Sequence, residues 1–199
     1  ALPTSVLLGR PWDIDLNLMA TLPALEPGLG ALEGNVLFTG PCLAGRSPPA
    51  AGDPALAVLE RPAPEGVRSA YLSMGTVFNG RPEVFARLLD GLVAVGLRVI
   101  VSAGASAGAL EKRPRPGVHV FRRVPQLEVL ERVDVVVTHG GNNTTLETMA
   151  AGKPMLVVPF GGDQQANASR VQRLGVGLAL RPNALAPSAV QRAVTELLS

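Results

Sequence analysis

Three glycine-containing turns, each directly after an apolar run, carry the polar side chains that could do chemistry. They are residues 73–76 (SMGT), residues 139–145 (HGGNNTT) and residues 160–165 (FGGDQQ). Glycine lets the backbone approach a ligand, and a helix that starts after such a turn offers unpaired N–H groups at the positive end of its dipole. The second turn is therefore typical of a phosphate or diphosphate site, where His139 could donate a hydrogen bond to the anion.

Each turn taken alone also has an ordinary structural interpretation. Residues 73–76 fit a plain glycine turn, and His139 fits a hydrogen-bonded structural histidine. Thr144 and Glu147 have the T-x-x-E spacing of a capping box, in which Glu147 would satisfy the amides of its own helix. Asp163 fits the N-cap of the helix that follows it, although a carboxylate beside an amide also suits the neighbouring hydroxyls of a sugar ring.

The composition excludes several classes of protein. A chain of 199 residues with 47% hydrophobic and 17% charged side chains can bury one sizeable core, with at most an attached arm. The formal charge of +2 is too small for a nucleic-acid-binding surface. The single cysteine, Cys42, allows neither an internal disulfide nor a thiolate metal cluster. No apolar run reaches the roughly 20 residues that span a bilayer, so we expect no membrane span and a cytoplasmic location.

Strands and helices alternate along most of the chain. We predict strands at 69–74, 97–103, 118–121, 133–138, 155–159 and 177–180, helices at 83–95, 125–131, 143–151, 163–174 and 185–198, and a loop over 104–117. A further helix is expected over 53–60, with Asp53 as its N-cap. This order predicts an α/β fold with a doubly wound, Rossmann-like parallel sheet. In such sheets ligands bind beyond the carboxyl ends of the strands, where the strand order switches.

The first 52 residues differ in character from the rest. They contain seven prolines among short apolar runs, a pattern that breaks helices and suits an extended connector, with one short strand expected at 35–39. We therefore expect a linker over 1–52 and a ligand-binding domain over 53–199. Because the chain begins at Ala1 and not at methionine, we expect it to be a fragment of something longer.

The three turns, in this order, resemble a known signature. The matching residues are Val124-Pro125-Gln126, His139-Gly140-Gly141, Glu147, Gly152-x-Pro154, and Asp163-Gln164 with Asn167. This pattern resembles the donor-binding signature of nucleotide-sugar glycosyltransferases of the GT-B fold, which have two Rossmann domains. The nearest group is similar to glycosyltransferase family 1, particularly its bacterial macrolide and antibiotic branch. The resemblance extends loosely from about residue 38 to the end, and it implies the carboxyl-terminal, donor-binding half of such an enzyme.

For the nucleoside, the resemblance implies that Gln126 and the backbone near Val124 hold the base and the ribose. Glu147 would accept hydrogen bonds from the ribose hydroxyls. Plant relatives have a tryptophan, which stacks on uracil, where this chain has Arg123. A guanidinium can also stack on a base, so Arg123 keeps the site usable but leaves both UDP and dTDP open as the donor nucleotide.

For the rest of the donor, the resemblance implies contacts with the diphosphate and with a hexose. Asp163 and Gln164 would hold the transferred hexose. Breaking the anomeric bond builds negative charge on the departing diphosphate, so hydrogen-bond donors placed there lower the barrier. The groups implied to cradle the diphosphate are Thr76, His139, Asn143, Thr144 and the amides from Gly141 onward.

The resemblance also implies what the chain lacks. No cofactor is expected beyond the nucleotide-sugar substrate, and no metal, because the D-x-D triplet Asp13-Ile14-Asp15 lies in the expected linker. In this family the general base for an inverting transfer to a small-molecule hydroxyl is a histidine of the amino-terminal, acceptor-binding domain. Neither His119 nor His139 fits that role, so we expect no catalytic residue here and a fragment that is inactive alone.

Two other interpretations keep the same fold. In the first, the chain is a separate subunit that supplies the nucleotide-sugar site to a different protein in a two-chain glycosyltransferase. In the second, it belongs to a nucleotide-sugar epimerase of related architecture. The epimerase is less favoured, because its acid and base groups would also have to come from a second domain.

Overall fold

The computed structural model describes residues 17–26, 36–41, 43, 50–76 and 79–199, in two compact units, Ala1–Gly45 and Arg46–Ser199. Each unit is considered by itself. Cys42 and the triplet Asp13-Ile14-Asp15 lie outside the described residues.

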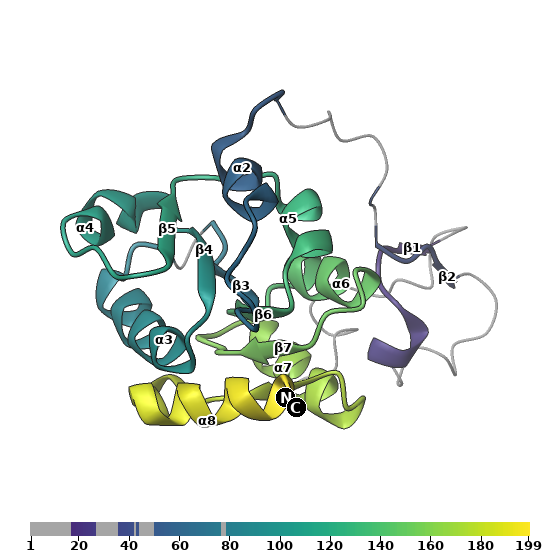
Figure 1. Cartoon of the computed structure of the whole chain (residues 1–199). Helices are drawn as coiled ribbons and strands as arrows, with labels where there is room; N and C mark the ends of the chain where they lie inside the picture. The colour runs from purple at the N-terminus through teal and green to yellow at the C-terminus, as the bar shows by residue number, and fades with distance from the viewer. Residues whose placement is uncertain (1–16, 27–35, 42, 44–49, 77–78) are drawn as a thin grey trace. The chain divides into compact units, whose positions relative to one another are not determined.

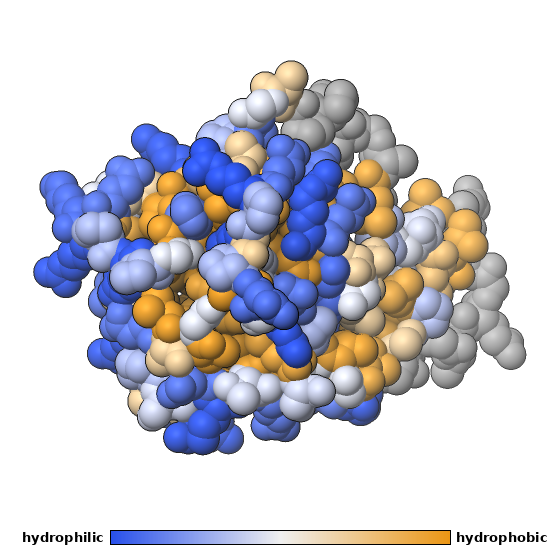
Figure 2. Space-filling view, viewed as in Figure 1, coloured by the Kyte–Doolittle hydropathy of each residue, from blue (hydrophilic) through white to orange (hydrophobic). Residues whose placement is uncertain are grey.

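The first unit contains a small parallel sheet. Strand β1 (Asn17–Met19) pairs with β2 (Val36–Phe38), and a 3-10 turn, η2 (Pro23–Leu25), follows β1. The strand expected at 35–39 is thus observed as β2, whereas β1 was not expected. Leu18 and Leu37 are register partners and are 63% and 52% exposed, and Figure 2 shows hydrophobic atoms at the surface over this pair of strands. The expected connector therefore holds a small sheet with an exposed apolar face.

The second unit is built on a six-stranded parallel sheet. Its strands are β3 (Ser69–Ser73), β4 (Arg98–Ser102), β5 (Val118–Phe121), β6 (Val135–Thr138), β7 (Met155–Val157) and β8 (Gly177–Ala179). Their order across the sheet is β5-β4-β3-β6-β7-β8. The predicted doubly wound sheet is confirmed, and the strand order switches between β3 and β6.

Seven α-helices of this unit lie in the described ranges 50–76 and 79–199 (Figure 1). They are α2 (Pro54–Glu60), α3 (Pro82–Val95), α4 (Ala107–Glu111), α5 (Gln126–Arg132), α6 (Asn142–Ala150), α7 (Gln164–Arg173) and α8 (Pro187–Leu197). Asp53 is the predicted N-cap of α2: its Oδ1 accepts from the amide of Ala55 at 2.9 Å. Within the part of the chain that is described, no helix is long and apolar enough to cross a membrane.

The prediction of a loop over 104–117 is wrong for the first half of this range. A 3-10 turn, η3 (Gly104–Ser106), runs directly into α4. Gly104, Ser106 and Gly108 favour a loop in sequence. Ala107 and Leu110 are nevertheless buried against the core, which stabilises a short helix there. The Ser106 hydroxyl also donates to the carbonyl of Asn79 and fixes the start of the turn.

The central strands β3, β6 and β7 are buried on both faces because helices cover both sides of the sheet. Alternate residues point to opposite faces, so Ala70 and Leu72 pack with α3, α4 and α8, whereas Tyr71 packs with α2, α5 and α7. Helices α3 and α8 lie along one another on the first face (Figure 1). Their contact depends on Gly91 of α3, where an added Cβ would lie 2.6 Å from Cβ of Val190 and 2.7 Å from the carbonyl oxygen of Pro187.

The α3–α8 contact gives a prediction about stability. We expect Gly91→Ala to lower the free energy of unfolding by about 1–3 kcal/mol, because the new methyl group meets a backbone oxygen that cannot move aside. The matched control is Gly108→Ala in α4, where nothing lies within 4 Å of an added Cβ; there the helix propensity of alanine should stabilise the protein by up to about 1 kcal/mol. Chemical denaturation measures both, and changes of the same sign would contradict the packing argument.

Candidate functional site

A cavity of about 930 Å³ opens at the carboxyl edge of the sheet, around the switch between β3 and β6. Its walls are the turns that follow β3, β4, β5 and β6, together with the start of α6. Pockets that take small molecules commonly have volumes of roughly 300–1,000 Å³. The lining residues are Ser73, Gly75, Thr76, Asn79, Ser102, Gly104, Ala105, Arg122, Arg123, Gln126, His139, Gly141, Asn142, Asn143, Thr144 and Glu147.

The ring of His139 lies between two glycines, one from each central turn. A Cβ on Gly75 would lie 2.5 Å from Cε1 of His139, and a Cβ on Gly141 would lie 2.5 Å from Nε2. Gly75 also has a φ of 69°, which other residues rarely adopt. Neither turn can therefore carry a side chain at these positions without displacing the imidazole.

His139 is only 9% exposed, and its surroundings favour the neutral ring. Burial lowers the pKa of His139 below 6.5, and the negative charge of Asp163 acts in the opposite direction. The Thr138 hydroxyl lies 3.4 Å from Nδ1. A neutral imidazole at neutral pH has one N–H to donate, which suits a hydrogen bond to an anion in the cavity.

Helix α6 begins at the cavity with an N-terminus that no side chain caps. Gly141 is the N-cap residue, with extended backbone, and Thr144 is already the third residue of the helix. The capping-box interpretation is therefore wrong, since it needs Thr144 itself at the N-cap position. The first-turn amides of a helix have no partner within it, and Asn142, Asn143 and Thr144 all line the cavity.

Glu147, one turn further along α6, is held by a chain of side-chain hydrogen bonds. Its carboxylate accepts from Nε2 of Gln126, whose Oε1 accepts from the hydroxyl of Tyr71 at 2.8 Å. Glu147 is only 4% exposed although it lines the cavity. A buried carboxylate fixed in this way can accept hydrogen bonds from ligand hydroxyls in one defined place.

The turn after β3 is braced by Asn79, which the sequence analysis did not single out. The side-chain amide of Asn79 donates to the carbonyls of Gly75 at 2.8 Å and Thr76 at 3.1 Å. It packs directly on Gly104, where an added Cβ would lie 2.2 Å from Nδ2 of Asn79. Gly104 has a φ of 54°, so the one sequence signal for this contact was a glycine directly after the strand predicted at 97–103.

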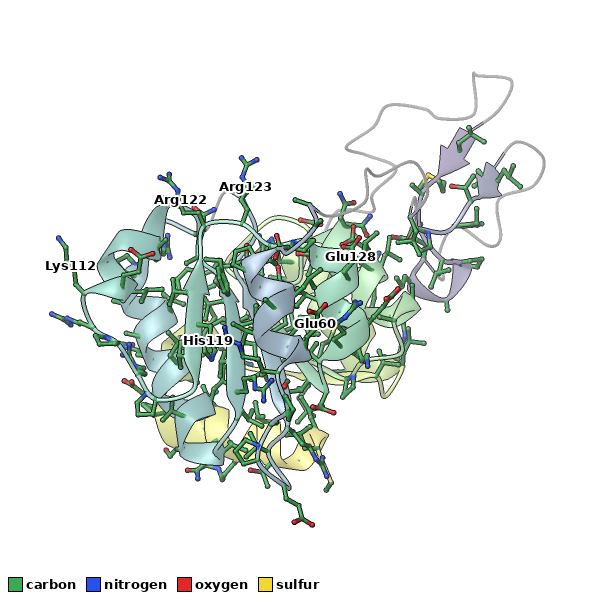
Figure 3. The ribbon with its side chains drawn as sticks, turned by 45° about the horizontal axis from the view of Figure 1, so that its top comes forward. Glu60, Lys112, His119, Arg122, Arg123 and Glu128 are labelled. Carbon is green, nitrogen blue, oxygen red and sulfur yellow. The ribbon has the colours of Figure 1, made fainter. Side chains whose placement is uncertain are left out.

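Two arginines follow β5 at the opposite wall. Arg122 and Arg123 are exposed, line the cavity and project from the end of β5 (Figure 3). Val124 comes next and is half-buried against the apolar cluster under α2 and α5. The structure therefore brings the two guanidinium groups to the cavity and turns Val124 away from its lining.

The third turn, between β7 and α7, lies behind the second and outside the cavity lining. Gln164 is buried, and its Oε1 accepts from the amides of Phe160 at 2.8 Å and Gly161 at 3.3 Å. Asp163 occupies the N-cap position of α7, but its carboxylate accepts from Nδ2 of Asn167 at 3.2 Å and does not cap the helix. The same nitrogen donates to the carbonyl of Gly140 at 2.8 Å, which ties this turn to the second.

Most of the residues singled out from the sequence meet at one place. The structure brings eight of them to the cavity and leaves Val124, Asp163 and Gln164 off its lining. Among the described residues, no group of three or more His, Cys, Asp or Glu side chains could hold a metal ion. The eight that line the cavity are Thr76, Arg123, Gln126, His139, Gly141, Asn143, Thr144 and Glu147.

Comparison with known proteins places this geometry among glycosyltransferases. Residues 86–199 match the family model of the erythromycin biosynthesis protein CIII-like, C-terminal domain. The NDP-glycosyltransferase YjiC of Bacillus licheniformis is 30% identical over 182 residues, 91% of this chain and 44% of that protein. The 4'-demethylrebeccamycin synthase of Lentzea aerocolonigenes is 30% identical over 186 residues, 92% of this chain and 42% of that protein.

Solved structures agree with these relatives. The glycosyltransferase of kitacinnamycin has a TM-score of 0.78 and 31% identity, covering 93% of this chain and 46% of that one. CalG4, the calicheamicin glycosyltransferase, has a TM-score of 0.75 and 28% identity, covering 94% and 46%. The chain thus spans less than half the length of these relatives. By its family match and its fold, it belongs to the erythromycin biosynthesis protein CIII-like C-terminal domain family of GT-B glycosyltransferases.

Proposed function

We propose that the chain is the donor-binding part of an inverting, metal-independent glycosyltransferase that moves a hexose from a UDP- or dTDP-sugar to the hydroxyl of a small-molecule acceptor. The observation that carries this proposal is the cavity at the β3–β6 switch, where an uncapped helix N-terminus and a buried carboxylate face one ligand space. An anion-binding end and a hydroxyl-binding end are the two things that a nucleoside diphosphate requires.

The diphosphate would lie at the start of α6. The amides from Gly141 onward point their partial positive charge into the cavity, and Asn143 and Thr144 add side-chain donors. His139 lies between Gly75 and Gly141 and would donate its N–H to the same oxygens, and Thr76 would reach them from the turn after β3. These donors would stabilise the charge that develops on the leaving diphosphate, so the proposal assigns no role to a divalent metal.

The nucleoside would extend toward α5 and the end of β5. Glu147 would accept from the ribose hydroxyls, and Gln126 beside it lines the same wall. Arg123 would stack on the base, because its exposed guanidinium lies at the cavity rim. The half-buried Val124 would contribute only its backbone, which is the part that the family resemblance implicates.

The hexose would lie toward the turn between β7 and α7. Asp163 acts on His139 through its charge, so its carboxylate lies near the proposed diphosphate end. Gln164 uses its side-chain oxygen to hold the amides of Phe160 and Gly161, so a hydroxyl of the hexose would meet its amide nitrogen. Contact with both residues would need the sugar to lie beyond the lining of the present cavity.

Transfer would require a second, acceptor-binding domain that supplies the general base. His119 lies in β5 and does not line the cavity, and its pKa is lowered by burial and by the charges of Arg98 and Arg61. In this proposal residues 1–52 form the connector to that domain, the chain alone binds the donor without turning it over, and the whole protein works in the cytoplasm.

The proposed function gives two predictions, and the first tests the ribose end of the cavity. We expect the chain to bind UDP or dTDP weakly, and Glu147→Ala to weaken the binding of UDP about tenfold or more, because charge-assisted hydrogen bonds to the ribose are lost. The control is Glu128→Ala, which removes a carboxylate of α5 outside the cavity lining (Figure 3). Isothermal titration calorimetry measures all three proteins. If neither UDP nor dTDP bound at millimolar concentration, the proposal would be contradicted.

The second prediction concerns pH. Burial lowers the pKa of His139, and a bound diphosphate would raise it, because the anion attracts the imidazolium. At a pH between the pKa of His139 in the free protein and its higher pKa in the complex, binding of UDP is accompanied by the uptake of a proton. The affinity for UDP therefore rises as the pH falls through that interval. We expect the ratio of UDP affinities, wild type over His139→Gln, to grow as the pH falls from about 8 to about 6.

Two features make this pH experiment specific. The β-phosphate of free UDP also titrates in this range, but this contribution is the same for both proteins and cancels in the ratio of their affinities. Uridine, which carries no phosphate, serves as the control ligand, and its affinity should respond equally to pH in both proteins. A ratio for UDP that stays constant with pH would show that His139 does not face the diphosphate.

A further inference from the structure

Tyr71 is the one tyrosine of the chain, and it lies between Ala70 and Leu72 in β3, the strand whose last residue, Ser73, lines the cavity. It is 1% exposed and packs within the apolar cluster of α2, α5 and α7. A phenol buried in this way needs a hydrogen-bond partner. The partner is the side chain of Gln126, whose Oε1 accepts from the hydroxyl at 2.8 Å.

That contact decides which way the Gln126 amide faces. With Oε1 held by Tyr71, the NH₂ group of Gln126 faces α6, where it donates to Oε2 of Glu147 and lies 3.4 Å from the hydroxyl of Thr144. The reverse orientation of the amide would set its oxygen against the acceptor-only carboxylate of Glu147, and it would take away the oxygen that accepts the proton of the phenol. Tyr71 and Glu147 thus fix one Gln126 orientation between them, from opposite sides.

The surroundings of the phenol keep its proton in place. Burial is the main cause that raises the pKa of Tyr71 to about 12; the hydroxyls of Ser73 and Ser102 act in the opposite direction, and the charge of Glu147 raises it further. The phenol therefore stays protonated over the whole range in which proteins are handled. It is a constant donor toward Gln126.

We propose that Tyr71 is a positioning residue that acts through Gln126 to hold the Glu147 carboxylate in place, and that this gives the site a preference for ribonucleoside diphosphates over their 2′-deoxy counterparts. The inference rests on the proposed function, in which Glu147 binds the ribose. A carboxylate held in one orientation binds a ribose most tightly when both the 2′- and the 3′-hydroxyl can donate to it. It binds a sugar that lacks one of these hydroxyls less tightly. Between the two donor nucleotides, the proposal therefore favours UDP over dTDP.

The test compares UDP with 2′-deoxy-UDP, which carry the same base and the same diphosphate. We expect the wild-type chain to bind UDP about tenfold more tightly, the usual value of one or two hydrogen bonds to a charged group. Tyr71→Phe removes only the hydroxyl, and it should weaken UDP binding severalfold while leaving 2′-deoxy-UDP nearly unchanged, so that the preference falls to about threefold or less.

The matched control is Thr148→Val, which also removes one buried hydroxyl from the described core. The Thr148 hydroxyl donates to the carbonyl of Thr144 within α6, and Thr148 does not line the cavity. We expect this variant to lose stability and to keep the full preference for UDP. A merely structural role for Tyr71 would make Tyr71→Phe behave like this control, with a lower melting temperature and an unchanged ratio of affinities, and that result would overturn the inference.

A second variant covers the case in which Tyr71→Phe does not fold. Gln126→Met keeps the length of the side chain and removes the amide, at a half-buried position where folding is less at risk. It should show the same narrowed preference on its own. Where Tyr71→Phe does fold, adding it to Gln126→Met should change the affinities no further, since the two residues act in series. The inference would be overturned if the losses of UDP affinity in Tyr71→Phe and Gln126→Met added up in the double variant. It would also be overturned if the wild-type chain bound UDP and 2′-deoxy-UDP equally. Either result would leave the proposed function intact. A wild-type chain that binds neither UDP nor dTDP would overturn both.

Discussion

The pairing of β3 with β6 is the constraint on which the arrangement of the cavity depends. Ser73 at the end of β3 is in register with Thr138 at the end of β6, so the turns that follow the two strands face each other. Because the chain leaves these strands toward opposite sides of the sheet, no helix fills the space between the turns. A shift of one residue in this register would turn alternate side chains to the other face and move His139 out of its place between Gly75 and Gly141.

Side-chain hydrogen bonds hold the turns around the cavity before any ligand arrives. Asn167 holds the carbonyl of Gly140, Gln164 holds the turn after β7, and Asn79 holds the turn after β3. Among the described residues, the one buried side-chain polar atom without a partner is the hydroxyl of Thr21, in the first unit. The walls of the cavity are therefore fixed by their own hydrogen bonds, which is the condition under which dipoles stabilise developing charge without reorganising.

The elements with a clear hydrophobic period could be predicted from the sequence. Strand β5 has the predicted bounds, and Asp53 caps α2 as its spacing with the following proline indicated. Helix α4 was missed because Gly104, Ser106 and Gly108 favour a loop, while the burial that stabilises the helix depends on distant parts of the chain. Short helices with few apolar residues are decided by tertiary contacts, which no local pattern contains.

In the site too, local sequence patterns predicted some residues, and contacts between distant parts of the chain decided the rest. Turns at strand ends identified His139, Glu147 and the other cavity residues, because parallel strands bring their carboxyl ends to one edge. Tyr71 was missed because it lies inside a strand whose neighbours are apolar, so the strand pattern explained it without reference to its hydroxyl. Asp163 was placed in the correct turn, but the link from Asn167 to Gly140 that sets this turn behind the cavity joins residues far apart in the sequence.

The position of His139 between glycines of two distant turns has a thermodynamic consequence. The two turns follow different strands, and the ring contacts both, so the cavity exists only while the centre of the sheet is intact. A compound that binds there has no site on the unfolded chain, and its binding free energy adds to the stability of the native state. Melting temperature is therefore a direct readout of occupancy, and it allows whole libraries of sugar nucleotides to be ranked by how much each one stabilises the chain.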